Sequence, residues 1–443
     1  MKVVLISTYE LGRQPFGLAS PAAWLQSAGH EVACADLAVG MLPSVQVQEA
    51  DLIAIYVPMH TATRLAGAVL ERVRSLNARA HLCCYGLYAP LNDAHLRSLG
   101  VQSILGGEFE GALVRLVDSL ANGAGSLSET SLERQAFLVP DRGRLPVLER
   151  YPKLVSNGVK SRVGYTEASR GCKHLCRHCP VVPVYQGSFR VVQADIVMED
   201  IRRQVAAGAE HITFGDPDFL NGPTHGQRIV ERLHGEFPSI TYDITAKVEH
   251  LLKHRNMLPT LRNTGCLFVI SAVESVQPDV LERLDKGHTS ADFIEVAGLF
   301  RAAGLTLTPT FLPFTPWTTI EGFQALLDAV RRLDLVDNVA PVQWSLRLLI
   351  PSGSRLLELE DTRRYIGSFD GQALVYPWRH PDSEVEALAT RVSTIVRSGL
   401  RAKKSRSAIF HDIWEAAHGS PLPVDYRLLP RTVIPYMEEP WFC

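Results

Sequence analysis

The stretch Ala168-Ser-Arg-Gly-Cys172-Lys-His-Leu-Cys176-Arg-His178-Cys179-Pro180 places three thiols close together in a C-x3-C-x2-C spacing. Thiolates favour soft metal centres, and no fourth cysteine lies nearby in the sequence. A cubane of four irons and four sulfides normally takes four protein ligands, so three thiolates would leave one iron open. In a zinc site, His174 or His178 would fill the remaining position instead. The stretch alone therefore indicates a metal site of one of these two kinds.

Length and composition bound the rest of the chain. A length of 443 residues suggests about two to three domains. Hydrophobic residues make up 46% and charged residues 21%, which is typical of a folded globular protein. With 45 basic and 47 acidic residues the net charge is -2, so the chain has no excess of positive charge for a polyanion. We therefore expect neither nucleic acid nor a membrane surface as a partner.

The start of the chain and its cysteine content indicate a compartment. Met-Lys-Val-Val-Leu-Ile opens the sequence without the long apolar region and cleavage site of a signal peptide. No apolar stretch reaches the ~18 residues needed to span a bilayer. The 8 cysteines are too few for a disulfide scaffold in a chain of this length. We expect a cytoplasmic protein, in which a reducing environment leaves the three thiols available for metal.

Residues 1–125 alternate β-branched runs with helical patterns. Strands are expected at residues 2–6, 31–35, 51–57, 80–84 and 102–105, and helices at residues 21–28, 62–76 and 111–120. Alternation of this kind predicts a Rossmann-like, doubly wound parallel sheet, which binds its ligands beyond the carboxyl ends of the strands. Residues 126–160 are small, polar and proline-punctuated, and are expected to be a linker.

The strand–helix rhythm resumes over residues 161–350. Strands are expected at residues 162–167, 211–214, 240–244, 266–272, 305–311 and 342–350, with helices that include residues 194–207, 277–284, 292–303 and 321–333. Six such units predict a partial (β/α)6 barrel with its chemistry at the carboxyl ends of the strands. Residues 351–443 lose the alternation, and helical patterns at 384–396 and 408–417 predict an α-rich C-terminal extension.

The cysteine motif, placed after the first strand of such a series, resembles that of the radical S-adenosylmethionine (SAM) enzymes over about residues 161–350. The resemblance implies a 4Fe-4S cluster held by Cys172, Cys176 and Cys179, with SAM chelating the open iron. It implies a 5'-deoxyadenosyl radical as the product of SAM cleavage, and an external electron donor of the flavodoxin or ferredoxin type. The family usually has an aromatic residue beside the adenine just before the third cysteine, where this chain has His178.

Polar residues at other strand ends are the expected contacts of SAM. The turn Thr213-Phe-Gly-Asp-Pro-Asp218-Phe lies where the family carries a Gly-Gly-Glu-like turn that holds the ammonium group of SAM. Asp216 or Asp218 would serve that purpose here. Lys247 is expected to neutralise the carboxylate of SAM, and the segment from Ser271 to Glu274 to bind its ribose. The alternative for each is a residue that only caps a helix or faces solvent.

The N-terminal region resembles the cobalamin-binding domain that precedes many radical SAM enzymes. The matching pieces are residues 16–32 and Gly106-Gly-Glu-Phe-Glu110, which implies cobalamin near Gly106, Gly107 and Glu108. The D-x-H-x-x-G signature of related mutases is absent from the loop after the first strand, so a bound cobalamin would have no histidine on its lower face. The alternative is a Rossmann-like domain that binds no cobalamin and serves only for packing.

Three further segments, residues 57–63, 85–92 and 347–357, resemble a narrower group, the CUAEP/CCAEP-tail radical SAM proteins. That group carries paired cysteine or selenocysteine residues ahead of a Glu-Pro in its tail. The corresponding segment here, Tyr436-Met-Glu-Glu439-Pro440, keeps only the Glu-Pro. Cys443 either supplies one replacement thiol or is a frayed chain end.

The sequence therefore predicts a two-domain α/β enzyme with a C-terminal extension. Its expected reaction is cobalamin-dependent methylation at an unactivated position of a small-molecule or peptide substrate. One alternative is SAM cleavage for a rearrangement, a coupling or 3-amino-3-carboxypropyl transfer without cobalamin. Another is a non-catalytic iron-sulfur or cobalamin-binding sensor.

Overall fold

Short aliphatic runs form the strands of the N-terminal sheet, as the sequence predicts. The computed structural model describes residues 1–423 and 434–438. The strands of this sheet are β1 (Lys2–Ser7), β2 (Glu31–Asp36), β3 (Leu52–Tyr56), β4 (His81–Tyr85), β5 (Ser103–Gly107) and β6 (Glu129–Ser131). All pairs are parallel, in the order β2-β1-β3-β4-β5-β6. This order changes direction between β1 and β3, where doubly wound sheets open a crevice for ligands.

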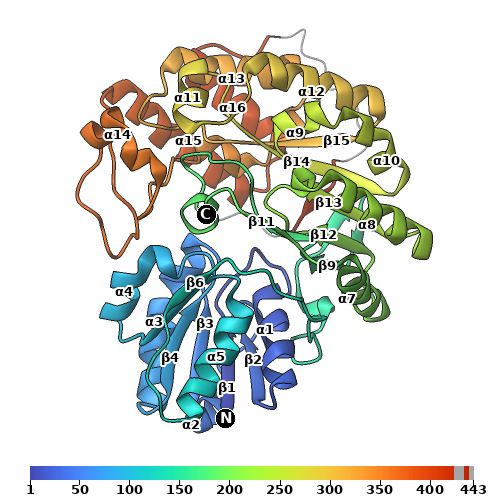
Figure 1. Cartoon of the computed structure of the whole chain (residues 1–443). Coiled ribbons are helices and arrows are strands. Elements are labelled where there is room, and N and C mark those ends of the chain that lie inside the picture. The colour runs from blue at the N-terminus through green and yellow to red at the C-terminus, as the bar shows by residue number, and fades with distance from the viewer. Residues whose placement is uncertain (424–433, 439–443) are drawn as a thin grey trace.

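Helices cover both faces of this sheet (Figure 1). Alternate side chains of the strands point to opposite faces. Val3 and Leu5 pack with α1 (Phe16–Ser27) and α5 (Phe109–Ala121). Val4 and Ile6 pack on the other side, in the core that includes α3 (His60–Leu76). Two shorter helices, α2 (Ser44–Glu49) and α4 (Asp93–Ser98), complete this domain.

The segment expected as a linker contributes to both domains. Its residues 129–131 form β6 and extend the N-terminal sheet. Its end forms an antiparallel hairpin of β7 (Leu154–Ser156) and β8 (Val159–Ser161). The C-terminal strand β16 (Tyr436–Met437) adds to β7, so the tail returns to the start of the second domain.

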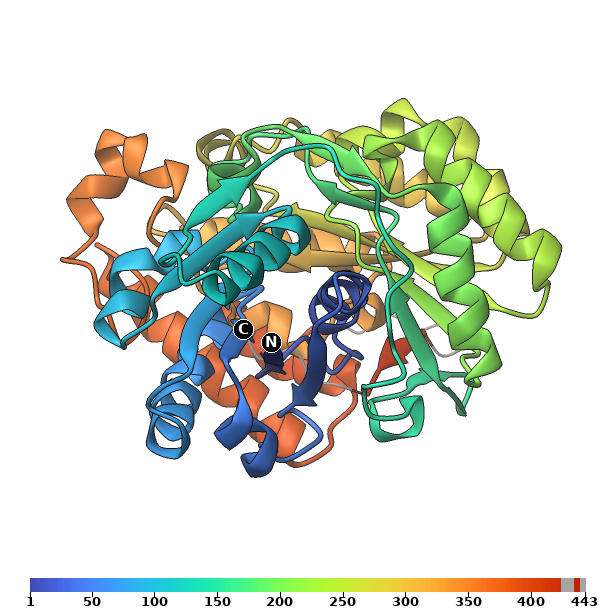
Figure 2. The same cartoon turned by 60° about the horizontal axis from the view of Figure 1, so that its bottom comes forward.

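The second domain is built on a five-stranded parallel sheet in the order β15-β14-β13-β12-β9. Its strands are β9 (Val163–Thr166), β12 (His211–Phe214), β13 (Thr241–Thr245), β14 (Cys266–Glu274) and β15 (Thr306–Phe311). The helices of this domain include α7 (Ala194–Ala206), α8 (Pro223–Glu236), α9 (Val248–Lys253), α10 (Leu258–Asn263), α11 (Pro278–Leu284), α12 (Ser290–Ala303) and α13 (Ile320–Arg332). Ile212, Ile244 and Val269 point toward the helices, so the other face of each strand lines the inside of the curved sheet (Figure 2).

The expected sixth strand over residues 342–350 does not form. Pro341–Ser345 is a 3-10 helix, and only one isolated parallel bridge, between Phe314 and Arg347, continues the sheet. Pro341 favours this helix because proline fits the first turn. Trp344 is buried between Phe311 and Phe410, at ring centroid distances of 5.9 and 5.5 Å. The α/β fold class is confirmed, and the partial barrel has five strands rather than six.

The C-terminal region is α-rich, as predicted. It contains α14 (Glu360–Tyr365), α15 (Ser383–Arg401) and α16 (Arg406–His418). Val392 and Ile413 from α15 and α16 join the core of the second domain, so the extension packs against the barrel rather than standing apart. Within the described residues, no helix is both long and apolar enough to cross a membrane. Glu439, Pro440 and Cys443 lie outside the described residues.

One buried ion pair joins the linker to the second domain. Arg142 donates from Nε to Asp200 Oδ1 at 2.7 Å and from a terminal nitrogen to Asp200 Oδ2 at 2.9 Å. Its guanidinium also donates to the carbonyl of Tyr165 and to the side chain of Gln14, in the loop after β1. Asp200 is 1% exposed, so the loss of Arg142 would leave a buried charge without its partner.

Replacing Arg142 with alanine is expected to lower the free energy of unfolding by about 3–5 kcal/mol, because Asp200 would remain buried and unpaired. Arg144→Ala is the matched control, since Arg144 makes an exposed ion pair with Asp141 at 3.3 Å. It should cost only about 0–1 kcal/mol. Urea denaturation of both variants measures the difference, and equal effects would contradict a structural role for Arg142.

Candidate active site

The loop with the three cysteines lies between β10 (Ser169–Gly171) and the short helix α6 (Val181–Tyr185). Strand β11 (Phe189–Val191) pairs antiparallel with β10 and closes the base of the loop. Cys172 and Cys176 are buried, and Cys179 is half-buried. Cys172 and Cys179 pack with Val184 and Tyr185 in one apolar cluster. The loop therefore holds its thiols in a sheltered, apolar setting at the carboxyl edge of the sheet.

The spacing of the thiols disfavours a single metal ion. Zinc–sulfur bonds of about 2.3 Å place the sulfurs of a tetrahedral site about 3.8 Å apart. In the described part of the chain, the three thiols do not form a group whose ligand atoms all lie within 4.8 Å of one another. Ligands of a cubane bind different irons and are spaced more widely than ligands of one ion. The arrangement therefore fits a cluster better than zinc.

Burial disfavours the thiolate form of Cys172 and Cys179. It raises the pKa of Cys179 to about 12, with Cys176 and Cys172 adding to the increase. It also raises the pKa of Cys172, although hydrogen bonds with the backbone of His174 and with the side chain of Asn221 oppose the change. Thiolates at these positions therefore need the positive charge of a metal centre, and metal binding would release their protons.

The two histidines of the loop turn away from the thiols. His174 Nε2 lies 3.2 Å from His250 Nε2. His178 Nε2 lies 3.3 Å from Glu274 Oε1. The zinc interpretation required one of these rings as a fourth ligand beside the cysteines, and both rings are engaged elsewhere.

Other residues of the loop fix it to the barrel. Lys173 donates from its backbone nitrogen to Asn221 Oδ1 at 3.2 Å and from Nζ to Asn221 O at 2.7 Å. Arg177 donates to the carbonyls of Glu282 and Arg283 from its guanidinium and to the carbonyl of Leu284 from its backbone nitrogen. These contacts hold both sides of the loop in place.

Arg170 fixes the start of the loop to the N-terminal domain. This guanidinium lies within 3.2 Å of Glu108, 2.7 Å of Glu110 and 2.7 Å of Glu167. Only 6% of the Arg170 side chain is exposed, so its charge is balanced almost entirely by these carboxylates. Burial raises the pKa of Glu108 to about 7; Arg170 opposes this effect and Glu110 adds to it.

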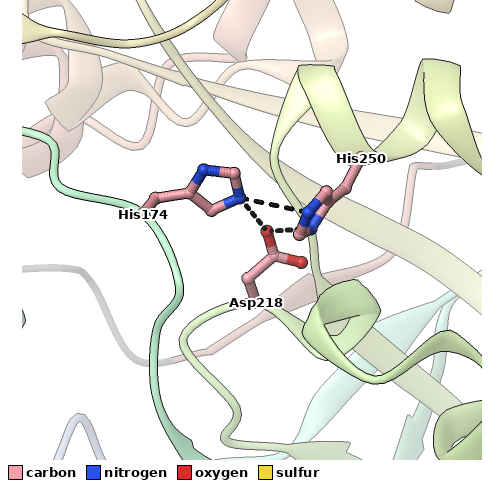
Figure 3. Close-up of side chains that lie close together, drawn as sticks. All are labelled: His174, Asp218 and His250. Carbon is pink, nitrogen blue, oxygen red and sulfur yellow. Dashed lines mark hydrogen bonds and ion pairs between the residues drawn. The ribbon is translucent and has the colours of Figure 1, made fainter. Parts of the chain in front are cut away.

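Asp216 and Asp218 have different surroundings. Asp216 accepts from the backbone nitrogen of Ala168 at 3.0 Å and from the hydroxyl of Ser169. Burial raises the pKa of Asp216 to about 7, despite these hydrogen bonds. Its contacts position the chain that leads into the cysteine loop. Asp218 instead lies 2.8 Å from His250 and 3.8 Å from His174 (Figure 3).

Lys247 lies beside this group. Its backbone nitrogen is 3.4 Å from Asp218 Oδ2, and its Nζ is 3.5 Å from Glu249. Burial and the nearby Lys247 and His250 lower the pKa of His174 to about 4, so the His174 imidazole is neutral at neutral pH. His250, which lies three residues after Lys247, was not identified from the sequence. The signal for it in the sequence was its position just after the end of a strand.

Glu274 is held at a strained strand end. Its φ is +67°, and the pairing of β14 with β15 shifts register just before it. A non-glycine residue at such a φ is uncommon and is often found at functional sites. Burial opposes ionisation of Glu274, but Lys286 and His178 more than offset burial and lower its pKa to about 2. Glu274 is therefore a carboxylate that faces the cysteine loop.

Ser271 points elsewhere. By the alternation of β14, its side chain lies on the face of Val269 and Val273, which packs against the helices. It is fully buried. The predicted site residues His178, Asp216, Asp218, Lys247 and Glu274 thus gather around the cysteine loop, whereas the side chain of Ser271 does not. Lys286 joins the group through Glu274, and Arg170 through Glu167.

A cavity of about 600 Å³ lies on the inner face of the same sheet. Most of its wall is apolar, with Phe268 and Ile270 from β14. Arg13, from the loop after β1, and Arg406 also line it. Nε of Arg13 is buried and has no hydrogen-bond partner among the described residues. Ligand pockets are commonly about 300–1,000 Å³, and the volume of this cavity falls in that range.

The crevice at the carboxyl ends of the N-terminal strands is filled by aromatic rings. Tyr56, Tyr85 and Phe109 pack with centroid distances of 5.1–5.8 Å. A Cβ on Gly17 would come within 2.2 Å of the Tyr56 ring, and Tyr85 donates its hydroxyl to the Gly17 carbonyl. The remaining cavity between the domains is about 140 Å³. This space is smaller than an ordinary small-molecule pocket, and a corrin does not fit it in this conformation.

The residues predicted for cobalamin are also engaged. Gly107 has a φ of +66°, and a Cβ there would come within 2.1 Å of the Ser131 carbonyl on β6. A Cβ on Gly106 would meet Pro90 at 2.7 Å. Glu108 pairs with Arg170. The glycines therefore allow close packing of β6 and Pro90 in this conformation.

Residues 166–330 match the Radical SAM superfamily, so the chain carries a radical SAM domain. The hopanoid C-3 methylase of Methylococcus capsulatus is 24% identical over 325 residues, which cover 69% of this chain and 62% of that protein. An uncharacterized methyltransferase of Pyrococcus horikoshii is 24% identical over 53% of this chain and 54% of its own length. The chain thus spans less than two thirds of these curated relatives.

Two solved structures are similar in fold. The cobalamin-dependent SAM radical enzyme OxsB, with aqua-cobalamin and SAM bound, gives a TM-score of 0.71 at 15% identity, over 92% of this chain and 71% of that one. The radical SAM methyltransferase TsrM from Kitasatospora setae, with cobalamin and a [4Fe-4S] cluster bound, gives a TM-score of 0.61 at 16% identity. The match covers 75% of this chain and 70% of that one. The likeness in fold to OxsB therefore extends over both domains of this chain.

The raised pKa of Glu108 predicts how the free energy of unfolding changes with pH. Its pKa is about 7 in the folded chain and 4.5 ordinarily, so folding favours the protonated carboxyl. The stabilisation from this group is complete below about pH 4.5 and is lost as the pH rises through about 7, by on the order of 3 kcal/mol. Glu108→Gln keeps a neutral side chain throughout, and its stability should fall less over this range. Denaturation between pH 4.5 and 8 tests this, with Glu133→Gln at an exposed position as the control.

Proposed function

We propose that this chain is an enzyme that reductively cleaves SAM at a 4Fe-4S cluster held by Cys172, Cys176 and Cys179. The observation that carries the proposal is the set of three sheltered thiols in one loop, which is docked on both sides within the radical SAM domain. A bound cluster with one open iron supplies the electron that breaks a carbon–sulfur bond of SAM and yields a 5'-deoxyadenosyl radical.

The neighbours of the loop would bind and orient SAM. Glu274, ionised and held between His178 and Lys286, is suited to accept from a ribose hydroxyl or an ammonium group. Lys247 is suited to pair with the SAM carboxylate. His178 would lie beside the adenine, as the family resemblance implies, and Asp216 fixes the entrance of the loop through Ala168 and Ser169. Asp218 is the other candidate for the ammonium group of SAM.

The cavity of about 600 Å³ would hold the substrate. Its apolar wall excludes water, which protects a carbon radical from side reactions. The guanidinium of Arg13, which lines the cavity, would supply a donor for a polar group of the substrate. A small molecule or an extended peptide segment would fit this volume.

For the group transferred, we propose methyl. The supports are the likeness in fold to OxsB over 92% of the chain and the relatives named as methylases. In OxsB and TsrM the bound cobalamin is part of the structure. Cobalamin-dependent methylation at an unactivated carbon is therefore the first candidate.

The filled crevice favours a second candidate. Tyr56, Tyr85 and Phe109 occupy the strand ends where the N-terminal domain would meet a corrin. Cleavage of SAM for a rearrangement, a coupling or 3-amino-3-carboxypropyl transfer requires no cobalamin. Both candidates would take electrons from an external donor of the flavodoxin or ferredoxin type, in the reducing environment of the cytoplasm.

Cys176→Ala is expected to abolish the brown absorbance of the reconstituted cluster and to reduce 5'-deoxyadenosine formation to background. Cys266→Ala is the matched control, because this thiol is buried in β14 away from the loop. It should retain the absorbance and the cleavage. Iron and sulfide analysis under anaerobic conditions checks both variants, and a Cys176→Ala protein that keeps its cluster would disprove the assignment.

The products of SAM separate the two candidates. With reduced cluster and added cobalamin, methylation predicts 5'-deoxyadenosine together with S-adenosylhomocysteine, and a cobalamin band that co-elutes with the protein. The absence of that band, with 5'-deoxyadenosine alone, would support a cobalamin-free radical reaction. Methylthioadenosine would indicate 3-amino-3-carboxypropyl transfer. Mass spectrometry and absorbance after gel filtration provide these measurements.

A further inference from the structure

Asp218 is a buried carboxylate whose ion pairs are only with histidines. It is fully buried, and in the described part of the chain the ionisable side chains within 4.0 Å of its carboxylate are those of His174 and His250. Its Oδ1 accepts from the backbone nitrogen of Leu220 at 3.0 Å. Burying a carboxylate is costly unless a cation or enough hydrogen bonds compensate. Two imidazoles and one carboxylate that converge in this way are also a common ligand set for a divalent transition metal.

The three side chains lie close enough together to share one ion. His174 Nε2 lies 3.2 Å from His250 Nε2 and 3.8 Å from Asp218 Oδ2, and His250 Nδ1 lies 2.8 Å from Asp218 Oδ2. Bonds of about 2.1 Å place neighbouring ligands of one ion about 3.0–3.4 Å apart. His250 would bind through one of its two ring nitrogens, and the side chains would move slightly to reach this spacing. Each of the three residues offers a ligand atom within 4.8 Å of the others. Figure 3 shows the three side chains pointing toward one another from the cysteine loop, the turn after β12 and helix α9.

Hydrogen bonding leaves part of this group unsatisfied. His250 is 7% exposed, and its Nδ1 has no hydrogen-bond partner although Asp218 Oδ2 is 2.8 Å away. The contact is close enough for a hydrogen bond but lacks the direction for one. A buried ring nitrogen without a hydrogen bond, with a carboxylate beside it, is an arrangement that a metal ion would complete.

The surroundings supply an outer partner and an entry path. His174 Nδ1 lies 3.5 Å from Glu249, so the ring nitrogen opposite to Nε2 faces a carboxylate. Metal-bound histidines usually donate their second nitrogen to such a group. Glu249 is 42% exposed and lines a surface cavity of about 340 Å³ with Lys253 and Asp292. An ion could reach the group along this side.

We propose that His174, Asp218 and His250 bind one divalent transition-metal ion, such as Zn²⁺ or Fe²⁺, beside the cysteine loop. The site goes beyond the proposed function, because neither cluster binding nor SAM cleavage requires it. Three protein ligands leave a position open for water or for an oxygen of a bound ligand. The ion would tie the cysteine loop to the ends of β12 and β13. It would make Asp218 a metal ligand and leave Glu274 as the carboxylate for SAM.

The test uses the full chain with its cluster reconstituted and Zn²⁺ as the probe. After removal of loosely bound metal, the protein should retain one zinc per chain in addition to its cluster iron. X-ray absorption at the zinc edge should show nitrogen and oxygen neighbours at about 2.0–2.1 Å and no sulfur at about 2.3 Å. Failure to retain zinc would overturn the proposal. A sulfur shell would also overturn it, since it would place the zinc on the cysteines.

Variants locate the site independently of SAM cleavage. Asp218→Asn and His250→Ala should weaken zinc binding by more than about tenfold, the smallest loss usual for groups one step further from a metal. Their iron and sulfide content should not change. His254→Ala is the matched control, because the His254 ring lies 5.7 Å from that of His250 but outside the group. Equal zinc affinity in His250→Ala and His254→Ala would disprove the assignment.

Discussion

The buried guanidinium of Arg170 is the interaction on which the arrangement of the site depends. Glu108 and Glu110 contact it from the N-terminal domain, and Glu167 contacts it from the end of β9. The ring centroids of Phe109 and Phe137 lie 5.3 and 5.0 Å from its Cζ. Such a charge is tolerated inside a protein only when its partners are all in place. Because Arg170 lies two residues before Cys172, the packing of the two domains and the position of the first thiol are set by the same contacts.

The cysteine loop is accordingly fixed before any ligand binds. Asn221 holds its first half, and the carbonyls at the end of α11 hold its second half. Its two histidines contact residues at the ends of the neighbouring strands β13 and β14. A rigid loop keeps its thiols at a constant spacing, which lowers the cost of organising a cluster. The strained backbone of Glu274 contributes to the same arrangement, because its positive φ directs the carboxylate at the loop. The cavity of about 600 Å³ lies on the inner face of the same sheet.

Much of this fold follows from local sequence. Alternating strand and helix patterns predicted every strand of the N-terminal sheet except β6, and the cysteine spacing predicted the loop. Residues 342–350 were predicted wrongly as a strand. An alternating apolar run is compatible with a strand and also with a buried irregular segment, and these residues adopt the irregular form, with Trp344 packed in the core. Contacts between segments that are distant in the chain could not be predicted from the sequence. Nothing local distinguishes Asp216, which bonds to Ala168, from Asp218, which faces two histidines, or reveals that Tyr56 fills the crevice against Gly17.

The central claim is that three thiolates hold a cluster whose fourth iron is open to SAM. Mössbauer spectroscopy of the protein reconstituted with ⁵⁷Fe, recorded with and without SAM, tests this claim most directly. A cluster bound by Cys172, Cys176 and Cys179 predicts that one iron in four changes its isomer shift when SAM is added. Four irons that respond alike, or that do not respond to SAM at all, would contradict it.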